Sequence, residues 1–343
     1  MKIKVIGAGF AGLWTSLFLL KKGYNVELYE QSYPGYGASS KAAGILSFQI
    51  PLQIMDYAIR SAKLYEELNH NLLKWKESIW IPKKEEFSCA LKISDYLLKK
   101  GFKGKIVEKE FNSFKISEKA IIIEQAVIDS GMAVNELANK IVELGGNIIG
   151  SRFTKDKIID EKNNVLVLAN GSWIKELIYI NGLINYKCQA YDVEGKQIDN
   201  IIEDDIKEYY YVPESNNRAI IGNGKRVLLK KPEDGYISNI YDAYRILEKI
   251  SSNYNNALDM YPVSSWSAPC ITSNDGFPLV GKINENKYII TALNGAGLTL
   301  SASLAELLAD IIEGKKEQPL IFNPLRFKDN NHYEIKEVFE NIC

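Results

Sequence analysis

Glycines near the two ends of the chain carry its strongest chemical signal. Gly7, Gly9 and Gly12 follow residues 2–6, which alternate between polar and apolar, end apolar and are expected to form a central strand. At this spacing the first glycine permits a tight turn, the second lets a pyrophosphate approach the backbone, and the third lets the next helix pack on the strand. That helix, expected over residues 10–22, points its positive end at the phosphates. The segment predicts a dinucleotide-binding turn.

An acidic residue and a second glycine-rich segment narrow the choice of ligand. Glu30 closes the next expected strand, residues 26–30, where its carboxylate can accept hydrogen bonds from both hydroxyls of a ribose. Residues 294–300 read NGAGLTL and open another expected helix. Two distant segments of this kind favour a long cofactor held from both ends, which FAD fits better than NAD. The alternative is a tight strand–helix turn that binds no ligand.

Two further segments could contact such a cofactor. The loop 37–46 is small and rich in hydroxyls, so a planar ring can lie against its backbone, and Ser39 and Ser40 can bind phosphate or ribitol oxygens. Residues 165–173 form an apolar run that ends in a glycine and a tryptophan, which is typical of a buried parallel strand whose end meets a cofactor. Without their neighbours, the first segment is a flexible loop and the second a plain buried strand and turn.

In this order the motifs resemble the D-amino-acid oxidase family of FAD-dependent oxidoreductases, which includes glycine oxidase, sarcosine oxidase and dye-linked amino-acid dehydrogenases. Residues 266–281 (WSAPCITSNDGFPLVG) and 323–327 (NPLRF) extend the resemblance over most of the chain. The resemblance implies bound FAD, with residues 293–299 around the pyrimidine end of the flavin and Phe153 beside the adenine. Together with the motif residues, the expected cofactor-binding set is Gly7, Gly9, Phe10, Ala11, Gly12, Glu30, Gln31, Ser39, Ser40, Ala43, Gly44, Ile45, Phe153, Ala169, Gly171, Trp173, Asn294, Gly295, Gly297, Leu298 and Thr299.

The chain departs from this family where the substrate should bind. The family holds a substrate carboxylate with arginine, whose planar fork pairs with both carboxylate oxygens. Cys270 stands at the usual arginine position, and Gly295 stands where glycine oxidase has a second arginine. We expect either a replacement charge, from Lys41, Arg218 or Arg226, or a substrate that is not an ordinary α-amino acid. A lysine would supply a point charge without the fork.

Tyr210 and Cys270 are the candidates for the substrate pocket. The resemblance places a tyrosine over the substrate on a strand that ends in Val-Pro, which matches Tyr210. Alternation along the strand puts Tyr209 and Tyr211 on the opposite face. The plainer interpretations are a half-buried sheet surface for the tyrosines and a small buried hydrophobe for Cys270. Sarcosine-oxidase-like members attach flavin through a cysteine at the position of Ala268, so non-covalent FAD is expected here.

The expected fold class is α/β, with a Rossmann-like FAD-binding domain of the glutathione-reductase type interleaved with a mixed-sheet substrate domain. Alternating runs such as 183–191 and 209–221 predict strands in the second domain. The discontinuous FAD-binding domain is expected to comprise residues 1–75, 122–175 and 264–330. The substrate or cap domain is expected to comprise residues 76–121 and 176–263, and the C-terminal tail residues 331–343.

Composition argues against several other functions. The 343 residues carry a net charge of −1, so no nucleic acid or other polyanion is expected as a partner. Four cysteines without C-x-x-C spacing predict neither a disulfide framework nor a zinc site, and two histidines make a metal site or histidine catalysis unexpected. No run reaches the ~20 apolar residues of a membrane span. A reducing, cytoplasmic location is the default, and abundant Lys, Glu and Ile are compatible with a thermophile.

The resulting hypothesis is an FAD-dependent oxidoreductase that oxidises a C–N bond of an amine or amino acid by hydride transfer to flavin N5. Oxygen, a quinone or a protein could accept the electrons, and the chain could form a homo-oligomer or one subunit of a hetero-complex. Two alternatives stay open: a flavoprotein dehydrogenase for a substrate that is not an amino acid, and a flavin-carrying electron-transfer subunit. A cationic side chain that re-enters the pocket favours an amino acid, whereas an apolar pocket favours the first alternative.

Overall fold

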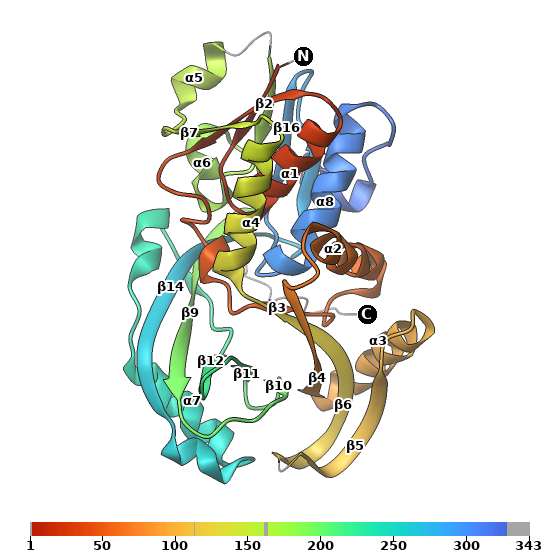
Figure 1. Ribbon diagram of the computed structural model, residues 1–343, viewed down its shortest axis with the longest axis vertical. Helices are drawn as coiled ribbons and strands as arrows, with labels where there is room; N and C mark the ends of the chain where they lie inside the picture. Colours follow the sequence, from red (N-terminus) through yellow and green to blue (C-terminus); the bar gives the residue numbers. More distant parts are fainter. Residues whose placement is uncertain (1, 113, 161–163, 328–343) are drawn as a thin grey trace.

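The computed structural model of the chain describes residues 2–112, 114–160 and 164–327. The predicted tail, 331–343, lies outside the described residues. Two sheets follow one another along the long axis of the molecule, and helices flank both (Figure 1). This mixed α/β architecture confirms the predicted fold class.

The smaller sheet is built around the parallel strand β1. Ile3 and Val5 of β1 face one hydrophobic cluster and Ile6 faces a second, so both faces of the strand are covered, as a parallel sheet requires. Only the edge strand β15 runs antiparallel, to β16. Across the sheet the order is β15 (Leu279–Lys282), β16 (Lys287–Thr291), β8 (Val165–Leu168), β1 (Lys2–Ile6), β2 (Asn25–Glu30) and β7 (Asn147–Gly150).

Helices cover both faces of the smaller sheet. On one face α1 (Phe10–Lys21) contacts both α4 (Ser130–Glu143) and α8 (Gly297–Ile312), and α2 (Met55–Leu68) packs against α8. Nearly every residue of α1 is buried, which explains why its sequence is apolar all round. The short helices α5 (Lys155–Asp160) and α6 (Ile174–Leu177) contribute side chains to the second hydrophobic cluster.

The larger sheet is mostly antiparallel. β14 (Tyr261–Ser273) pairs with β9 along almost its whole length, and β5 (Gly104–Phe111) pairs with β6. Figure 1 shows β14, β9, β6 and β5 as long curved strands in the lower half of the view, below the smaller sheet. The strand order is β13 (Val227–Leu228), β9 (Leu183–Glu194), β12 (Arg218–Gly222), β11 (Tyr209–Pro213), β10 (Ile201–Asp204), β4 (Leu73–Ile81), β6 (Phe114–Ile128) and β3 (Ile45–Leu46).

The two faces of the larger sheet have different neighbours. Tyr209 and Tyr211 of β11 join the cluster formed with α7 (Tyr241–Ser251), which covers one face. Tyr210 lies on the other face, where it packs against the cluster of Ala190, Val212 and Ile220, so the predicted alternation along this strand is confirmed. That second face is the one that meets the loop after β2, and it forms the roof of the site described below.

Three strands of the larger sheet cross the expected domain boundaries. β4 crosses the boundary at residues 75/76, β6 the one at 121/122, and β14 the one at 263/264. Long strands therefore connect the two halves of the molecule. The limits of the two domains stay a prediction.

The cysteines depart from the expectation drawn from their spacing. Cys89, in α3 (Phe87–Lys99), is disulfide-bonded, although the sequence predicted no disulfide framework. Cys188 and Cys270 are free thiols. In the described ranges no three His, Cys, Asp or Glu side chains group in a way that could hold a metal ion. Each helix in the same ranges is too short or too polar to cross a bilayer.

Candidate functional site

The glycine turn after β1 has no room for side chains. A Cβ on Gly12 would lie 1.8 Å from the carbonyl oxygen of Gly7, and a Cβ on Gly7 would lie 2.6 Å from that of Ala169. Gly7 also has a φ of +100°, which L side chains rarely adopt. The turn therefore holds β1, β8 and the start of α1 within backbone contact distance. The N-cap residue Gly9 has no side chain to cap α1, so N–H groups of the first turn that the helix leaves without a partner can bind an anionic group.

Glu30 fixes the loops around this turn. It ends β2 and is buried; its Oε2 accepts a hydrogen bond from the Ala8 N–H at 2.8 Å and its Oε1 one from the Ser32 N–H at 3.0 Å. A carboxylate has lone pairs left after two such bonds, and Glu30 lines the central cavity. Beside it, Tyr29 and Phe153 make an edge-to-face pair with ring centroids 5.3 Å apart. This end of the cavity thus offers acceptor oxygens next to an aromatic wall.

One large cavity runs from the glycine turn to the larger sheet. Its volume of about 1080 Å³ lies at the upper end of small-molecule sites, which suits a dinucleotide together with a substrate. All predicted cofactor-binding residues except Gly12 and Ser40 line this cavity. Gly12 lies behind it against Gly7, and Ser40 donates a hydrogen bond to the Gly35 carbonyl at 2.8 Å. Ser39 Oγ accepts a hydrogen bond from the Phe10 N–H at 3.0 Å, so the loop after β2 crosses the start of α1.

The second glycine-rich segment forms the far end of the cavity. Ala292 and Asn294 have φ angles of +55° and +52°, and Gly295 has +80°. Left-handed non-glycine residues of this kind concentrate at ligand-binding sites. Thr299, in the first turn of α8, accepts a hydrogen bond from the Ser47 N–H at 3.1 Å and donates one to the Ser47 carbonyl at 3.2 Å. The start of α8 is thereby fastened to the loop that follows β3.

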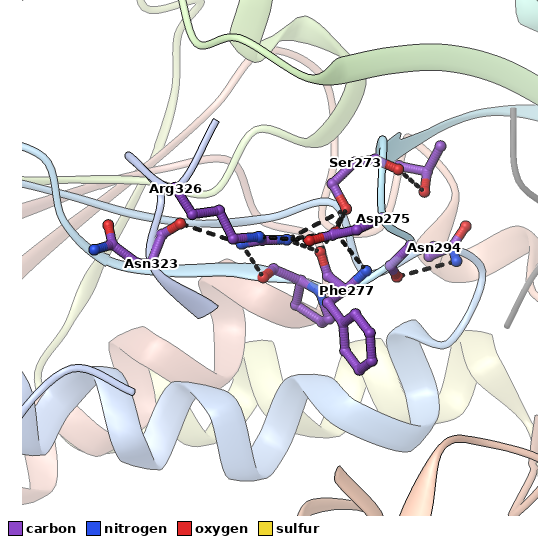
Figure 2. A network of polar contacts seen from close by, with 9 residues as sticks. Ser273, Asp275, Phe277, Asn294, Asn323 and Arg326 are labelled. Atoms are coloured by element: carbon purple, nitrogen blue, oxygen red, sulfur yellow. Dashed lines mark hydrogen bonds and ion pairs between the residues drawn. The ribbon is translucent and has the colours of Figure 1, made fainter. Parts of the chain in front are cut away.

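A polar network holds this segment in place (Figure 2). The Asn294 side chain donates to the Gly276 carbonyl at 3.1 Å, and Arg326 makes two 2.7 Å hydrogen bonds to the Asp275 carboxylate. Although burial raises it, the pKa of Asp275 ends below its usual range because of the Arg326 guanidinium. Arg326 also donates to the carbonyls of Phe277 and Pro278. The two sequence signatures that contain Asp275 and Arg326 therefore brace the cavity from outside.

Tyr210 lies in the roof of the cavity, in one row of side chains across the larger sheet. It stands opposite Glu203 of β10 and opposite Gly222 of β12. A Cβ on Gly222 would lie 2.2 Å from the Tyr210 hydroxyl, so the tyrosine ring lies flat over that glycine. Burial raises the pKa of Tyr210 well above its ordinary value, which keeps the phenol protonated and able to donate.

Cys270 shares the roof with residues that the sequence analysis did not predict. Cys188 on β9 is its diagonal neighbour across the β9–β14 pair. The thiols of Cys270 and Cys188 are hydrogen-bonded to each other. This bond lowers the pKa of Cys188, whereas the same bond and burial raise the pKa of Cys270. Arg226 lies over the Tyr186 ring, with 4.7 Å between the guanidinium carbon and the ring centroid. These five side chains, including Tyr210, all line the cavity.

Of the three cations considered as replacements for the family arginine, Arg226 has the most suitable position. Lys41 lines the cavity, but its ammonium donates to the carbonyls of Tyr36 and Gly37. Arg218 is paired with Asp192 and does not line the cavity. Arg226 lies beside Cys270, the position where the family arginine was expected, and it comes from the loop before β13.

The structure fits FAD on two independent observations. The glycine turn is a cradle that a single Cβ would fill. Several residues that line the cavity carry a buried oxygen without a hydrogen-bond partner among the described residues, and three of these oxygens lie in or beside the predicted cofactor segments: Asn170 Oδ1, Thr291 Oγ1 and Asn294 Oδ1. Buried polar atoms are nearly always satisfied, so a polar ligand in the cavity explains these three.

The fold and the cavity define a dinucleotide-binding α/β protein with a second sheet over its ligand. A family model described as FAD dependent oxidoreductase (DAO) matches residues 2–311. The chain belongs to this family, and the resemblance inferred from its motifs is confirmed; the protein is an FAD-dependent oxidoreductase.

Individual relatives are distant in sequence but similar in fold. Glycine oxidase of Geobacillus kaustophilus is 21% identical over 92% of this chain and 93% of its own. A putative Rieske 2Fe-2S iron–sulfur protein of Bacillus subtilis is 23% identical over 96% of this chain and 72% of its own. The crystal structure of the same glycine oxidase superposes with a TM-score of 0.82 at 19% identity, covering 95% of this chain and 99% of that one. L-Proline dehydrogenase from P. horikoshii gives 0.83 at 18% identity, covering 95% and 97%.

Proposed function

We propose that the protein oxidises the C–N bond of an amino acid, with the substrate carboxylate held by Arg226 and the substrate covered by Tyr210. The observation that carries this proposal is the cation beside Cys270 in the cavity wall. A guanidinium pairs with both oxygens of a carboxylate, which a neutral amine substrate would not require. A cationic side chain that enters the pocket from another segment is the feature expected to favour an amino acid over an uncharged amine or a hydroxy compound.

The residues of this chain would act mainly by positioning. Arg226 and the Tyr210 hydroxyl, both in the roof of the cavity, would bind the substrate carboxylate. The substrate would then lie between the roof and the loop 43–45 below it. Bound FAD supplies the acceptor, flavin N5, for the hydride that leaves the substrate α-carbon. The N-terminus of α8 would present backbone N–H groups where negative charge develops. The amine would react in its neutral form, and the product imine would hydrolyse in water.

Solved structures of similar fold support this substrate class. They include glycine oxidase, L-proline dehydrogenase and iminodiacetate oxidase, whose names specify substrates that carry both an amine and a carboxylate. The electron acceptor is proposed to be oxygen, a quinone or a protein. A cytoplasmic location also stays a proposal.

An anaerobic absorbance experiment tests the proposed reaction. The purified protein is expected to show oxidised-flavin bands, and a pooled panel of D- and L-amino acids and simple amines is expected to bleach the longer-wavelength band. Splitting the pool then identifies the substrate. Bleaching by amines without a carboxylate, but by no amino acid, would contradict the role given to Arg226. Flavin bands that no member of the panel bleaches would point to a different substrate class or to an electron-transfer subunit.

Non-covalent attachment of FAD gives a separate prediction. Ala268 lines the cavity where covalent members of the family carry a cysteine, and the free thiols nearby are Cys188 and Cys270. Acid precipitation is therefore expected to release all flavin into the supernatant, measured by its absorbance. Yellow colour that stays with the pellet would identify a covalent bond, and replacing Cys270 by Ser would then show whether that thiol forms it.

A further inference from the structure

A half-buried carboxylate in the roof of the cavity has no part in the mechanism above. Glu203 on β10 lines the cavity and stands directly opposite Tyr210 across the β10–β11 pair. Its Oε2 accepts hydrogen bonds from Gln125 Nε2 at 2.5 Å, Gln49 Nε2 at 2.6 Å and Ser78 Oγ at 3.3 Å. The carboxylate is thus held rigidly through one of its two oxygens.

The other oxygen is left for a ligand. Oε1 of Glu203 has one hydrogen bond among the described residues, from Ser47 Oγ at 3.4 Å. Gln125 cannot turn round to change this arrangement, because its own Oε1 accepts the Phe48 N–H at 2.8 Å. Ser47 is in turn fastened to Thr299 at the start of α8, so the open oxygen lies near the end of the cavity expected to hold the flavin.

The charge of Glu203 is also uncompensated. All four donors are neutral, and within the described residues the carboxylate makes no ion pair. A buried anion without a cationic partner is costly, and its pKa rises; burial raises that of Glu203 to about 7. A cationic ligand would remove this cost, so the arrangement is complementary to an ammonium group.

The position of Glu203 decides which nitrogen it can reach. β9, beneath Arg226, and β10 are three strand spacings apart, or roughly 14 Å across the sheet. The row that contains Glu203 also reaches β9 near Ala190, about four residues along the strand from Tyr186, so the two positions are more than ~14 Å apart. In an α-amino acid only one carbon separates the amine from the carboxylate. If Arg226 holds the carboxylate, the reacting amine stays near it, and only a distant nitrogen can reach Glu203.

We propose that Glu203 binds a second, positively charged nitrogen of the substrate, so that the site selects amino acids whose side chain ends in an amine. This inference rests on the proposed function for the position of the substrate carboxylate. It makes Glu203 a specificity-determining residue, and it gives the cavity two charged ends with Tyr210 between them.

Equilibrium binding to the FAD-loaded protein tests the inference without turnover. The probes are 6-aminohexanoate and hexanoate, which share a carboxylate and a chain length and differ in the terminal ammonium. By calorimetry the unaltered protein is expected to bind 6-aminohexanoate at least ~10-fold more tightly, since a buried charge pair contributes that much or more. Glu203→Gln is expected to remove this preference and to leave hexanoate binding unchanged. Glu208→Gln, which removes an exposed carboxylate from the same cavity lining, is the matched control and should keep the preference.

The pH dependence of the preference provides a second measurement. The ammonium stays charged from pH 6 to 8, whereas Glu203 gains its charge as pH rises through about 7, so the preference should grow over this interval. Asp205, the nearest other carboxyl, has a pKa of about 6, raised by burial, and its Oδ2 accepts a hydrogen bond from Trp80 Nε1; Tyr210 stays protonated throughout. In Glu203→Gln the same pH change should leave the preference flat.

The outcomes separate this inference from the proposed function. Equal affinity for the two probes, or an equal loss of both in Glu203→Gln, would overturn the role of Glu203 even if amino acids bleach the flavin. Bleaching by no amino acid would overturn the proposed reaction, while the two probes would still report on Glu203. With a confirmed reaction, lysine is expected to reduce the flavin at a lower concentration than norleucine, and Glu203→Gln should make the two alike.

Discussion

Replacing Arg226 with methionine is expected to lower kcat/KM for the amino-acid substrate by about 100-fold or more. Methionine keeps much of the side-chain volume over the Tyr186 ring but removes the charge and all five donors. The loss follows from leaving a carboxylate in a half-buried wall without its bidentate partner. The measurement is the rate of anaerobic flavin bleaching against substrate concentration, which gives the ratio directly.

Two controls make the Arg226 result specific. Arg226→Lys keeps the charge but not the planar fork, so it should recover part of the loss only. Lys225→Met removes the neighbouring cation, which also lines the cavity but is exposed, and should change kcat/KM by less than about threefold. If Arg226→Met left the rate unchanged while Lys225→Met reduced it, the carboxylate site would have to be moved to Lys225.

Substituting Gly12 by alanine is expected to abolish FAD retention. The new methyl group would lie 1.8 Å from the Gly7 carbonyl oxygen, well inside any allowed contact, so α1 must move away from β1. Overpacking of this kind costs about 1–3 kcal/mol or more, and here the strain falls on the turn that approaches the pyrophosphate. The flavin-to-protein ratio after gel filtration measures the effect, with far-ultraviolet circular dichroism to show that the chain is folded.

Gly150→Ala is the matched control for this substitution. Gly150 ends β7 in the same sheet, its backbone does not require glycine, and a Cβ there would meet nothing within 4 Å. Its flavin content should equal that of the unaltered protein. A Gly12→Ala protein that kept a full complement of FAD would show that the turn does not bind the cofactor.

The cofactor end of the molecule could be predicted because its signals are local. Gly7, Gly9 and Gly12 act within one strand–turn–helix unit, and their spacing alone fixes which backbone atoms come together. The helix expected at residues 10–22 matches α1 closely for the same reason, since an apolar run of helical length needs only its neighbours in sequence. The mixed α/β class followed from the order of these units.

At the substrate end of the cavity, the register between paired strands decides which side chains meet. Glu203 meets Tyr210 only because β10 and β11 pair antiparallel in one register, and it is held by Gln49 and Gln125, which are distant in the chain. A shift of one residue would turn each of these side chains to the opposite face. No spacing in the sequence encodes that alignment.

The position of Arg226 in the cavity could not be predicted from the sequence either. The sequence showed that the family arginine was missing at Cys270 and offered three cations, with nothing to choose among them. The loop before β13 brings Arg226 over Tyr186, a pairing set by the contact between β13 and β9. The sequence by itself thus determined the cofactor and the fold class, through contacts within short segments. The tertiary structure alone decided which charges face the substrate, because those charges come together only through pairing between strands far apart in the chain.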